Sequence, residues 1–281
     1  MNAITSPSAV PSPRTVAQRI ADRGLDRYLR GLGVEYPEVC AVPTPRATDT
    51  FAPISHQQLY EQVTEKLDRV GIKQTETFHS LYRGGDRYIG LALVDLLGPE
   101  SGREVAVGWF NSHDHSHAVT FLLGEQVTAC FNLCLHAEIK VTRKHTKHLQ
   151  RDLPRLIEDA VDRIGETVEV HQERMRRYEQ IVVREREAAH LLVQLLDAGA
   201  FPKGSFHTIL EEWRSPSTPQ WRERWNVNRL YQAVTVQRTP IGLMPRRHRA
   251  LHRVLDAHVD PFFGDSDVSR LLRDMNGALT R

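Results

Sequence analysis

With 281 residues, 40% of them hydrophobic and 26% charged, the chain has the composition of a globular protein and can bury one large core or two small ones. Its formal net charge of +2 excludes attraction to nucleic acid by the surface as a whole, so any electrostatic binding site must be local. No stretch approaches the ~20 apolar residues of a membrane-spanning helix, and the first residues lack the pattern of a signal peptide. We therefore expect a cytoplasmic protein without membrane contact, and an odd number of three cysteines agrees with a reducing compartment.

The N-terminal part of the chain predicts little regular structure. Residues 1–13 contain three prolines, three serines and no charged side chain, which is typical of a disordered tail. Weak helical periodicity over 14–30 indicates one short helix. Four prolines over 31–53 then interrupt any regular element, so we expect an extended connector and treat 14–54 as one N-terminal segment.

A helix is predicted from Ser55 to Val70. Ser55 and Gln58 have the spacing of a capping box, and Gly71 follows the last apolar position, as at many helix ends. One face of this helix is apolar and comprises Leu59, Val63, Leu67 and Val70.

The next segment predicts an antiparallel sheet, in which Gly84-Gly85 is a hairpin signal. The expected strands cover 78–83, 87–96, 103–110 and 118–127, followed by an alternating strand from Phe131 to Lys140. In the last strand Leu133 and Ile139 belong to an apolar face, whereas Cys134 and Lys140 belong to the other face. We therefore expect a half-buried strand with one solvated side.

From about residue 146 the apolar spacing becomes helical. One unbroken helix over 151–197 would be ~70 Å long, which is too long for a compact domain of this size. We therefore expect a break near Gly165 or Arg184.

Beyond a glycine-bounded segment at 199–204, short helical stretches separated by prolines predict a small helical unit over 205–281. The predicted fold class is α+β. An antiparallel β-meander packs against a long helix within a core of residues 55–198, and the C-terminal helical unit follows it.

Three histidines in the loop after the third strand suggest a metal site. His113 and His115 are ~7 Å apart at Cα in extended chain and project from one side, a geometry that can chelate a divalent metal. His117 is ~13 Å from the first histidine unless the loop curls, and Asp114 is a further ligand candidate. The alternative is a solvated hairpin loop in which Asn, Ser and Asp side chains bond the backbone.

The junction between the last strand and the long helix is strongly basic. Twelve residues from Lys140 to Arg151 contain five lysines and arginines and no acid, so they can neutralise phosphates. Cations at a helix start oppose the helix dipole, which favours a bound anion over a merely solvated surface. The predicted nucleic-acid contacts at this junction are Lys140, Arg143, Lys144, His145, Lys147, His148 and Arg151.

A second acid-free cluster, which includes Arg246 and Arg247, follows several aromatic residues in the C-terminal unit. Arginines track a phosphate backbone while aromatic faces stack on unpaired bases, so these two arginines are further candidate contacts. The alternative is that the indole rings simply form the core of a small helical unit.

Five short stretches follow one another in a distinctive order between residues 51 and 235. These are Phe51-Ala-Pro-Ile-Ser-His56, Asn111-Ser-His-Asp114, Cys130-Phe-Asn132, Arg143-Lys-His-Thr146 and Trp225-Asn-Val-Asn-Arg-Leu-Tyr-Gln-Ala-Val-Thr235. In their order they resemble a family, the uncharacterised phage/plasmid-like proteins of plasmids, prophages and phages, which are grouped as a domain of unknown function. This chain departs from the family at Leu133, where a glycine is usual, and in its histidine-rich loop.

The resemblance implies a role in the DNA metabolism of mobile elements but no particular mechanism. The order of a sheet meander followed by a long helix is also similar to that of single-strand annealing proteins, a similarity of topology alone.

We therefore predict a nucleic-acid-binding protein, preferring single-stranded DNA and acting by simple binding or by annealing. Signatures of enzymes such as a phosphate loop, Gly-x-Ser-x-Gly or His-Glu-x-x-His are missing from the sequence, so binding is favoured over catalysis. One alternative is a metal-dependent hydrolase or nuclease that uses the three loop histidines. The other is a non-catalytic homo-oligomer, whose interface would comprise Ile181, Val182, Leu191, Leu192 and Leu195.

Overall fold

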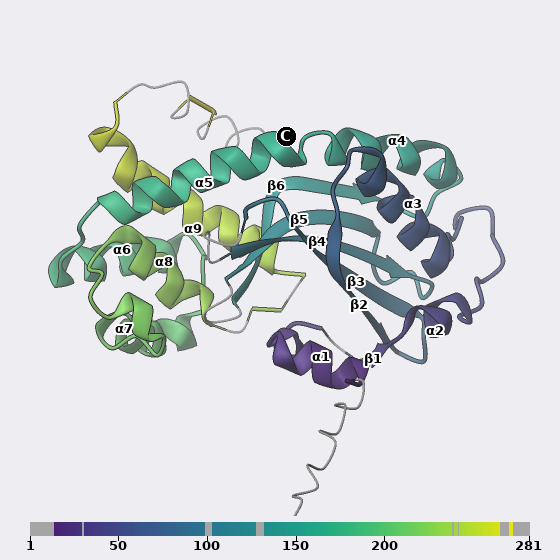
Figure 1. The fold of residues 1–281 in the computed structure, drawn as a ribbon, viewed down its shortest axis with the longest axis horizontal. Coiled ribbons are helices and arrows are strands. Elements are labelled where there is room, and N and C mark those ends of the chain that lie inside the picture. The colour runs from purple at the N-terminus through teal and green to yellow at the C-terminus, as the bar shows by residue number, and fades with distance from the viewer. Residues whose placement is uncertain are drawn as a thin grey trace, which may run out of the picture.

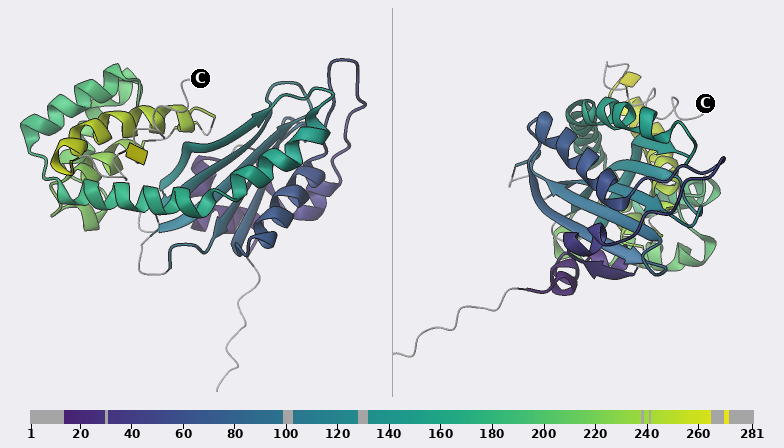
Figure 2. Two further views of the ribbon diagram at one scale, coloured as in Figure 1. Left: turned by 90° about the horizontal axis from the view of Figure 1, so that it is seen from above. Right: turned by 90° about the vertical axis from the view of Figure 1, so that its right-hand side faces the viewer.

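A computed structural model describes residues 14–29, 31–98, 103–127, 132–237, 239–240, 242–264 and 270–271. It confirms the α+β class: a six-stranded antiparallel sheet and a lobe of helices lie side by side and are bridged by the long helix α5 (Ile164–Gln180) (Figure 1). Further helices cover one face of the sheet, and α1 (Val16–Asp22) lies against the other (Figure 2). The predicted disordered tail lies outside the described residues. Within those residues, no helix is both long and apolar enough to cross a membrane.

The sheet is a meander, because each strand pairs antiparallel with its neighbour in the chain. Gly84 and Gly85 form the predicted hairpin turn with φ of 68° and 95°, a region that glycine enters without strain. The first strand lies where the sequence predicted an extended connector. The strands are β1 Leu32–Val34, β2 Gln74–Tyr82, β3 Arg87–Val94, β4 Arg103–Ser112, β5 Val119–Val127 and β6 Asn132–Arg143.

One face of the sheet is buried under α3 (His56–Arg69) and α4 (Leu149–Val161). α3 begins where predicted, because the hydroxyl of Ser55 accepts a hydrogen bond from the Gln58 amide at 2.9 Å and caps the helix. Packing beneath these helices is tight: a Cβ at Gly90 would lie 2.0 Å from the Trp109 indole.

The opposite face carries its own buried apolar cluster, which includes Leu91 and Ala106. Ile20 of α1 and Leu25 of the 3-10 helix η1 (Leu25–Arg27) pack on one part of it. Met244, the first residue of α9 (Met244–Val259), belongs to the same apolar cluster. The first and last helices of the described chain thus cover the same sheet face and leave part of it open.

An irregularity between β5 and β6 corrects the predicted faces of the last strand. The register shifts between Leu122 and Gly124, so that extra residues of β6 bulge from the ladder. Leu133 consequently packs on the face shared with α1, whereas Ile139 packs on the helix-covered face. Cys134, predicted on the solvated side, is buried in the helical lobe's core.

The long helical segment is interrupted at two places, close to the expected positions. Residues 162–163 separate α4 from α5, and residues 181–184 separate α5 from α6 (Glu185–Asp197). At the second interruption Val182 forms an isolated antiparallel bridge with Asn226.

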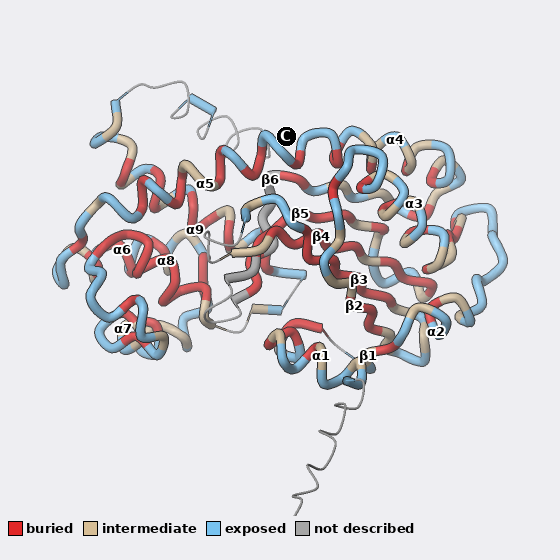
Figure 3. Tube along the Cα trace, in the orientation of Figure 1, coloured by how far each residue is buried: buried red, intermediate tan, exposed pale blue. Residues whose placement is uncertain are grey.

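The helical lobe consists of α6, α7 (Phe206–Arg214), α8 (Val227–Thr235) and α9, packed on the second half of α5. Figure 3 shows buried residues along the inner sides of these helices and exposed residues outside. α6, which the sequence grouped with the sheet, therefore shares its core with the C-terminal helices. The end of the predicted C-terminal unit, beyond residue 264, lies almost wholly outside the described residues.

Three residues of the expected subunit interface are not at the surface. Leu191, Leu192 and Leu195 are buried in the core of the helical lobe, where they contact the chain itself. Their apolar spacing therefore reflects intramolecular packing. Val182, by contrast, is exposed.

Candidate nucleic-acid interface

The three loop histidines do not converge on one point. His113 Nε2 donates to the carbonyl of Ile54 at 3.0 Å, and its ring stacks on His56 with centroids 4.0 Å apart. The His115 ring instead packs on the Phe51 ring, with their centroids 3.7 Å apart. Among the described residues, no group of three or more His, Cys, Asp or Glu could hold a metal ion.

The acid next to these histidines is also engaged. Burial opposes ionisation of Asp114, but hydrogen bonds from Ser116 and Arg87 lower the pKa of its carboxyl to about 2. Asp114 therefore stabilises the loop as the solvated-loop alternative predicted, and the metal-dependent hydrolase loses its proposed ligand set.

Instead, His113 joins His56 and His145 in a buried cluster that ties three distant segments together. His56 donates from Nε2 to the Gly85 carbonyl at 2.9 Å and accepts at Nδ1 from the side chain of Asn111. His145, predicted as a phosphate contact, is buried beside Phe51 at 5.0 Å between ring centroids. Its ring is therefore not presented to a ligand at the surface. Three stretches that carry the family resemblance meet in this cluster: 51–56, 111–114 and 143–146.

The cluster predicts a loss of stability in acid. Burial, followed by the neighbouring His113, lowers the pKa of His56 to about 4. The unfolded chain, with an ordinary histidine pKa of about 6.5, therefore binds more protons than the folded chain between pH 6.5 and 4. The free energy of unfolding should fall over that window by up to about 1.4 kcal/mol per pH unit for this residue.

Urea unfolding measured from pH 7.5 to 4 checks this expectation. A His56→Gln variant, which carries no titrating ring, should show a shallower pH dependence than the parent protein. The same change at the exposed His190 should leave the dependence unaltered. Equal slopes for His56→Gln and the parent would contradict the assignment.

The basic strand-to-helix junction is partly neutralised within the protein. Arg143 and Arg151 both pair with Asp152, in the first turn of α4, and the hydrogen bond from Arg151 lowers the pKa of Asp152. The predicted conflict with the helix dipole is therefore relieved by this aspartate. His148 is half-buried immediately before α4.

The lysines of the junction differ from its arginines. Lys140, Lys144 and Lys147 are exposed, and none of them forms an ion pair with a described carboxylate. The positive charges of these three lysines are therefore not neutralised by described acids, as the sequence predicted for all five cations of the junction.

A groove of about 400 Å³ lies on the partly open face of the sheet. Its floor follows one row across four strands, since Ile89 pairs with Phe110, Phe110 with Thr120 and Thr120 with Thr142. The remaining lining comes from neighbouring strand positions, from the loop before β5 and from the segment that leads into α9. The lining residues outside the row are Tyr82, His117, Ala118, Leu122, Lys140, Pro240, Gly242, Leu243 and Pro245.

The groove combines aromatic faces with positive charge. The rings of Tyr82 and Phe110 are half-buried, so each has part of its surface open to a ligand. Lys140 also lines the groove, and the described lining contains no aspartate or glutamate. Arg246, which is exposed, follows the lining residue Pro245 in the chain, and Arg247 donates to the Thr239 hydroxyl at 3.3 Å. The second arginine cluster therefore starts next in sequence to a wall residue of the groove.

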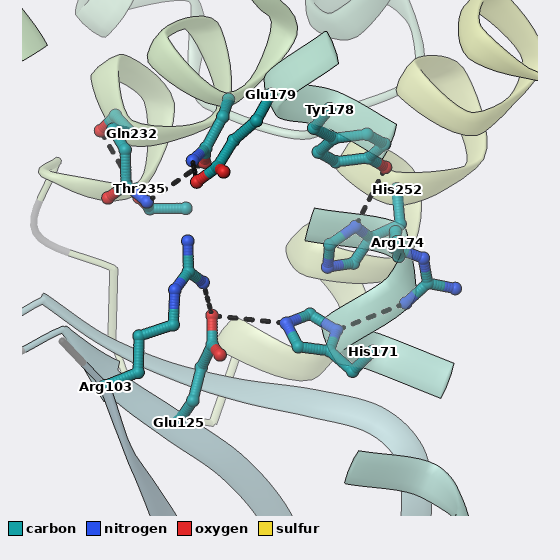
Figure 4. Close-up of polar contacts among 10 residues, drawn as sticks. Arg103, Glu125, His171, Arg174, Tyr178, Glu179, Gln232, Thr235 and His252 are labelled. Carbon is teal, nitrogen blue, oxygen red and sulfur yellow. Dashed lines mark hydrogen bonds and ion pairs between the residues drawn. The ribbon is translucent and has the colours of Figure 1, made fainter. Parts of the chain in front are cut away.

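A second polar region, which the sequence did not indicate, lies between the sheet and the helical lobe (Figure 4). Arg103 of β4 pairs with Glu125 of β5 at 2.5 Å, and His171 Nε2 of α5 lies 3.2 Å from the same carboxylate. Deeper in the lobe, Arg174 pairs with Asp256 at 3.2 Å. Opposite charges and hydrogen bonds balance these buried groups, which is the usual signature of a structural network.

Comparison with known proteins returned nothing: no family model, no curated protein and no solved structure matches the chain.

Proposed function

We propose that this protein binds single-stranded nucleic acid in the groove on the open face of its sheet. The observation that carries the proposal is the composition of the groove: Tyr82, Phe110 and Lys140 face one hollow whose described lining includes no carboxylate. Aromatic rings stack on bases of any sequence, and lysines attract the phosphate backbone. The open antiparallel sheet thus supplies both components of sequence-tolerant single-strand recognition.

Single strands suit the groove better than a duplex. The bases of a duplex are stacked and paired inside the helix, so they cannot reach rings set into a sheet face, whereas unpaired bases can be splayed onto them. Lys144 and Lys147 lie beyond the β6 end, outside the groove lining, and provide further positive charge for the approach of a polyanion. The implied setting remains the DNA metabolism of mobile elements, through binding or annealing.

Fluorescence anisotropy with labelled oligo-dT and oligo-U over a salt series tests the proposal. Phe110→Ala should weaken binding by roughly one to three kcal/mol, about 5- to 150-fold, because one stacked base loses its platform. Lys140→Ala should weaken binding and reduce the magnitude of the slope of log K against log salt by about 0.7. Lys203→Ala, an exposed lysine in the helical lobe, is the matched control and should bind like the parent.

Thermal unfolding of each variant separates lost binding from lost structure. Absence of binding by the folded parent protein would overturn the proposal. Equal affinities of Phe110→Ala, Lys140→Ala and the Lys203→Ala control would also overturn it, because binding would then occur outside the groove.

A further inference from the structure

α9 carries a line of arginines that begins at the groove. Arg246, Arg249 and Arg253 are three and four residues apart, so they lie on one side of the helix. Arg246 and Arg253 are exposed, and Arg249 is half-buried with its Nε lacking a hydrogen-bond partner. We call these three residues the arginine stripe.

Among the described residues, the stripe lacks acidic partners of the kind that other arginines have. On other helices an arginine commonly pairs with an acid one turn away, as Arg69 does with Glu65 and Arg176 with Glu173. Within the described part of the chain, no carboxylate pairs with any member of the stripe. The only acid of α9, Asp256, is buried against Arg174.

This arrangement costs stability in the free protein. Like charges one helical turn apart repel, and cations in a first turn oppose the helix dipole. Burial and the proximity of Arg246 lower the pKa of the adjacent Arg247, which indicates the crowding of positive charge. A phosphate backbone would relieve this repulsion, because each phosphate places a negative charge beside a guanidinium.

The arginine stripe also starts next to a residue of the groove wall. Pro245 forms part of the groove wall, and Arg246 is the next residue of the chain. From there α9 runs away from the sheet into the helical lobe (Figure 1). At 1.5 Å per residue, the seven steps from Arg246 to Arg253 extend about 10 Å along the helix axis.

We propose that the arginine stripe is a phosphate track along which a nucleic-acid strand leaves the groove. The inference rests on the proposed function and adds to it a direction and a length: bases bind over the sheet, and the backbone alone is held by α9. Arginine forks bind phosphate through paired hydrogen bonds, so the contact is independent of base sequence. Affinity should therefore rise with oligonucleotide length until the strand covers both the groove and α9.

An oligo-dT length series from about 4 to about 30 nucleotides, read by anisotropy, tests the track. The variant Arg246→Ala/Arg249→Ala/Arg253→Ala should bind the shortest oligonucleotides like the parent but gain little affinity with length. For long oligonucleotides its salt slope should be smaller in magnitude by about 2, which corresponds to three lost phosphate contacts. Replacement of the same residues by lysine should restore most of the slope, since charge is retained.

The charge-matched control is Arg155→Ala/Arg163→Ala/Arg186→Ala, which removes three exposed arginines from α4, from the α4–α5 junction and from α6. If the stripe variant and this control show the same length dependence while Phe110→Ala still weakens binding, the track is wrong and the groove stands. If Phe110→Ala and Lys140→Ala bind like the parent, the groove itself is wrong.

Discussion

Replacement of Arg229 by alanine should lower the free energy of unfolding by about 3–5 kcal/mol. The Arg229 side chain is buried in the helical lobe, with its Cζ 3.8 Å from the centroid of the Trp225 ring and 5.0 Å from that of Trp213. Its guanidinium donates to the carbonyls of Trp213, Arg214, Trp221 and Arg222 at 2.5 to 3.3 Å.

The cost arises because the guanidinium satisfies several carbonyls at once; of the four, only the Trp221 carbonyl has another donor among the described backbone hydrogen bonds, the Arg224 amide at 3.3 Å. The carbonyls of Trp213 and Arg214 lie at the end of α7, where backbone acceptors lack intrahelical partners and a cation is favoured. Hydrogen bonds to a charged group contribute about 1.5–3 kcal/mol each, and a buried acceptor left unpaired costs about 1–3 kcal/mol.

Urea unfolding followed by tryptophan fluorescence and circular dichroism measures the effect. Arg229→Lys should recover only part of the stability, because an ammonium cannot reach four carbonyls in the plane of the guanidinium fork. Arg224→Ala, a half-exposed arginine over Trp221, serves as the control and should cost less than about 1 kcal/mol. A loss below 1 kcal/mol for Arg229→Ala would contradict the role described.

Asp256→Ala should have a comparable effect, about 3–5 kcal/mol, for a different reason. Asp256 of α9 pairs with Arg174 of α5, and both side chains are buried. Tyr178 donates its hydroxyl proton to the same carboxylate at 2.6 Å. Removal of the carboxylate leaves a guanidinium in a region of low dielectric, together with a hydroxyl that loses its acceptor.

A double substitution distinguishes an unpaired charge from simple loss of packing. Arg174→Met/Asp256→Leu removes both charges and should be more stable than Asp256→Ala alone, because apolar pairs often replace buried ion pairs without loss. Asp159→Ala, at an exposed pair on α4, is the control and should cost less than about 1 kcal/mol. A double variant less stable than Asp256→Ala would argue against this explanation.

Local signals in the sequence were sufficient to predict several elements. α3 was predicted because Ser55 and Gln58 make a cap whose partners are three residues apart, and the β2–β3 hairpin because two glycines adopt positive φ. The interruptions on either side of α5 followed from the length limit of a compact domain.

Features that depend on distant segments were not predictable in this way. The bulge in β6 places Leu133 and Ile139 on opposite faces, although simple alternation assigns them to one. Similarly, the spacing of Leu191, Leu192 and Leu195 is the same whether they contact a second subunit or helices of their own chain.

The candidate site was predictable only in part. Lys140 and Arg246 were identified from local charge; Lys140 lines the groove, and Arg246 follows the lining residue Pro245 in the chain. Tyr82 of β2 and Phe110 of β4 were missed because β3 and β4, the strands at the centre of the sheet, are apolar on both faces, so no pattern shows which face the helices leave open. His145 lies in a basic run but is buried by Phe51, a contact across 94 residues that local composition cannot reveal.

The chain-order pairing of the meander has a consequence for synthesis on the ribosome. Each strand finds its partner as soon as the next hairpin emerges, so the sheet and its covering helices can fold before α9 is translated. Met244 is the last residue to be translated of the apolar cluster that also contains Ile20 and Leu25. A nascent chain stalled before Met244 should therefore expose part of the apolar sheet face to chaperones. Completion of the chain should cover that part and release the protein from the chaperones.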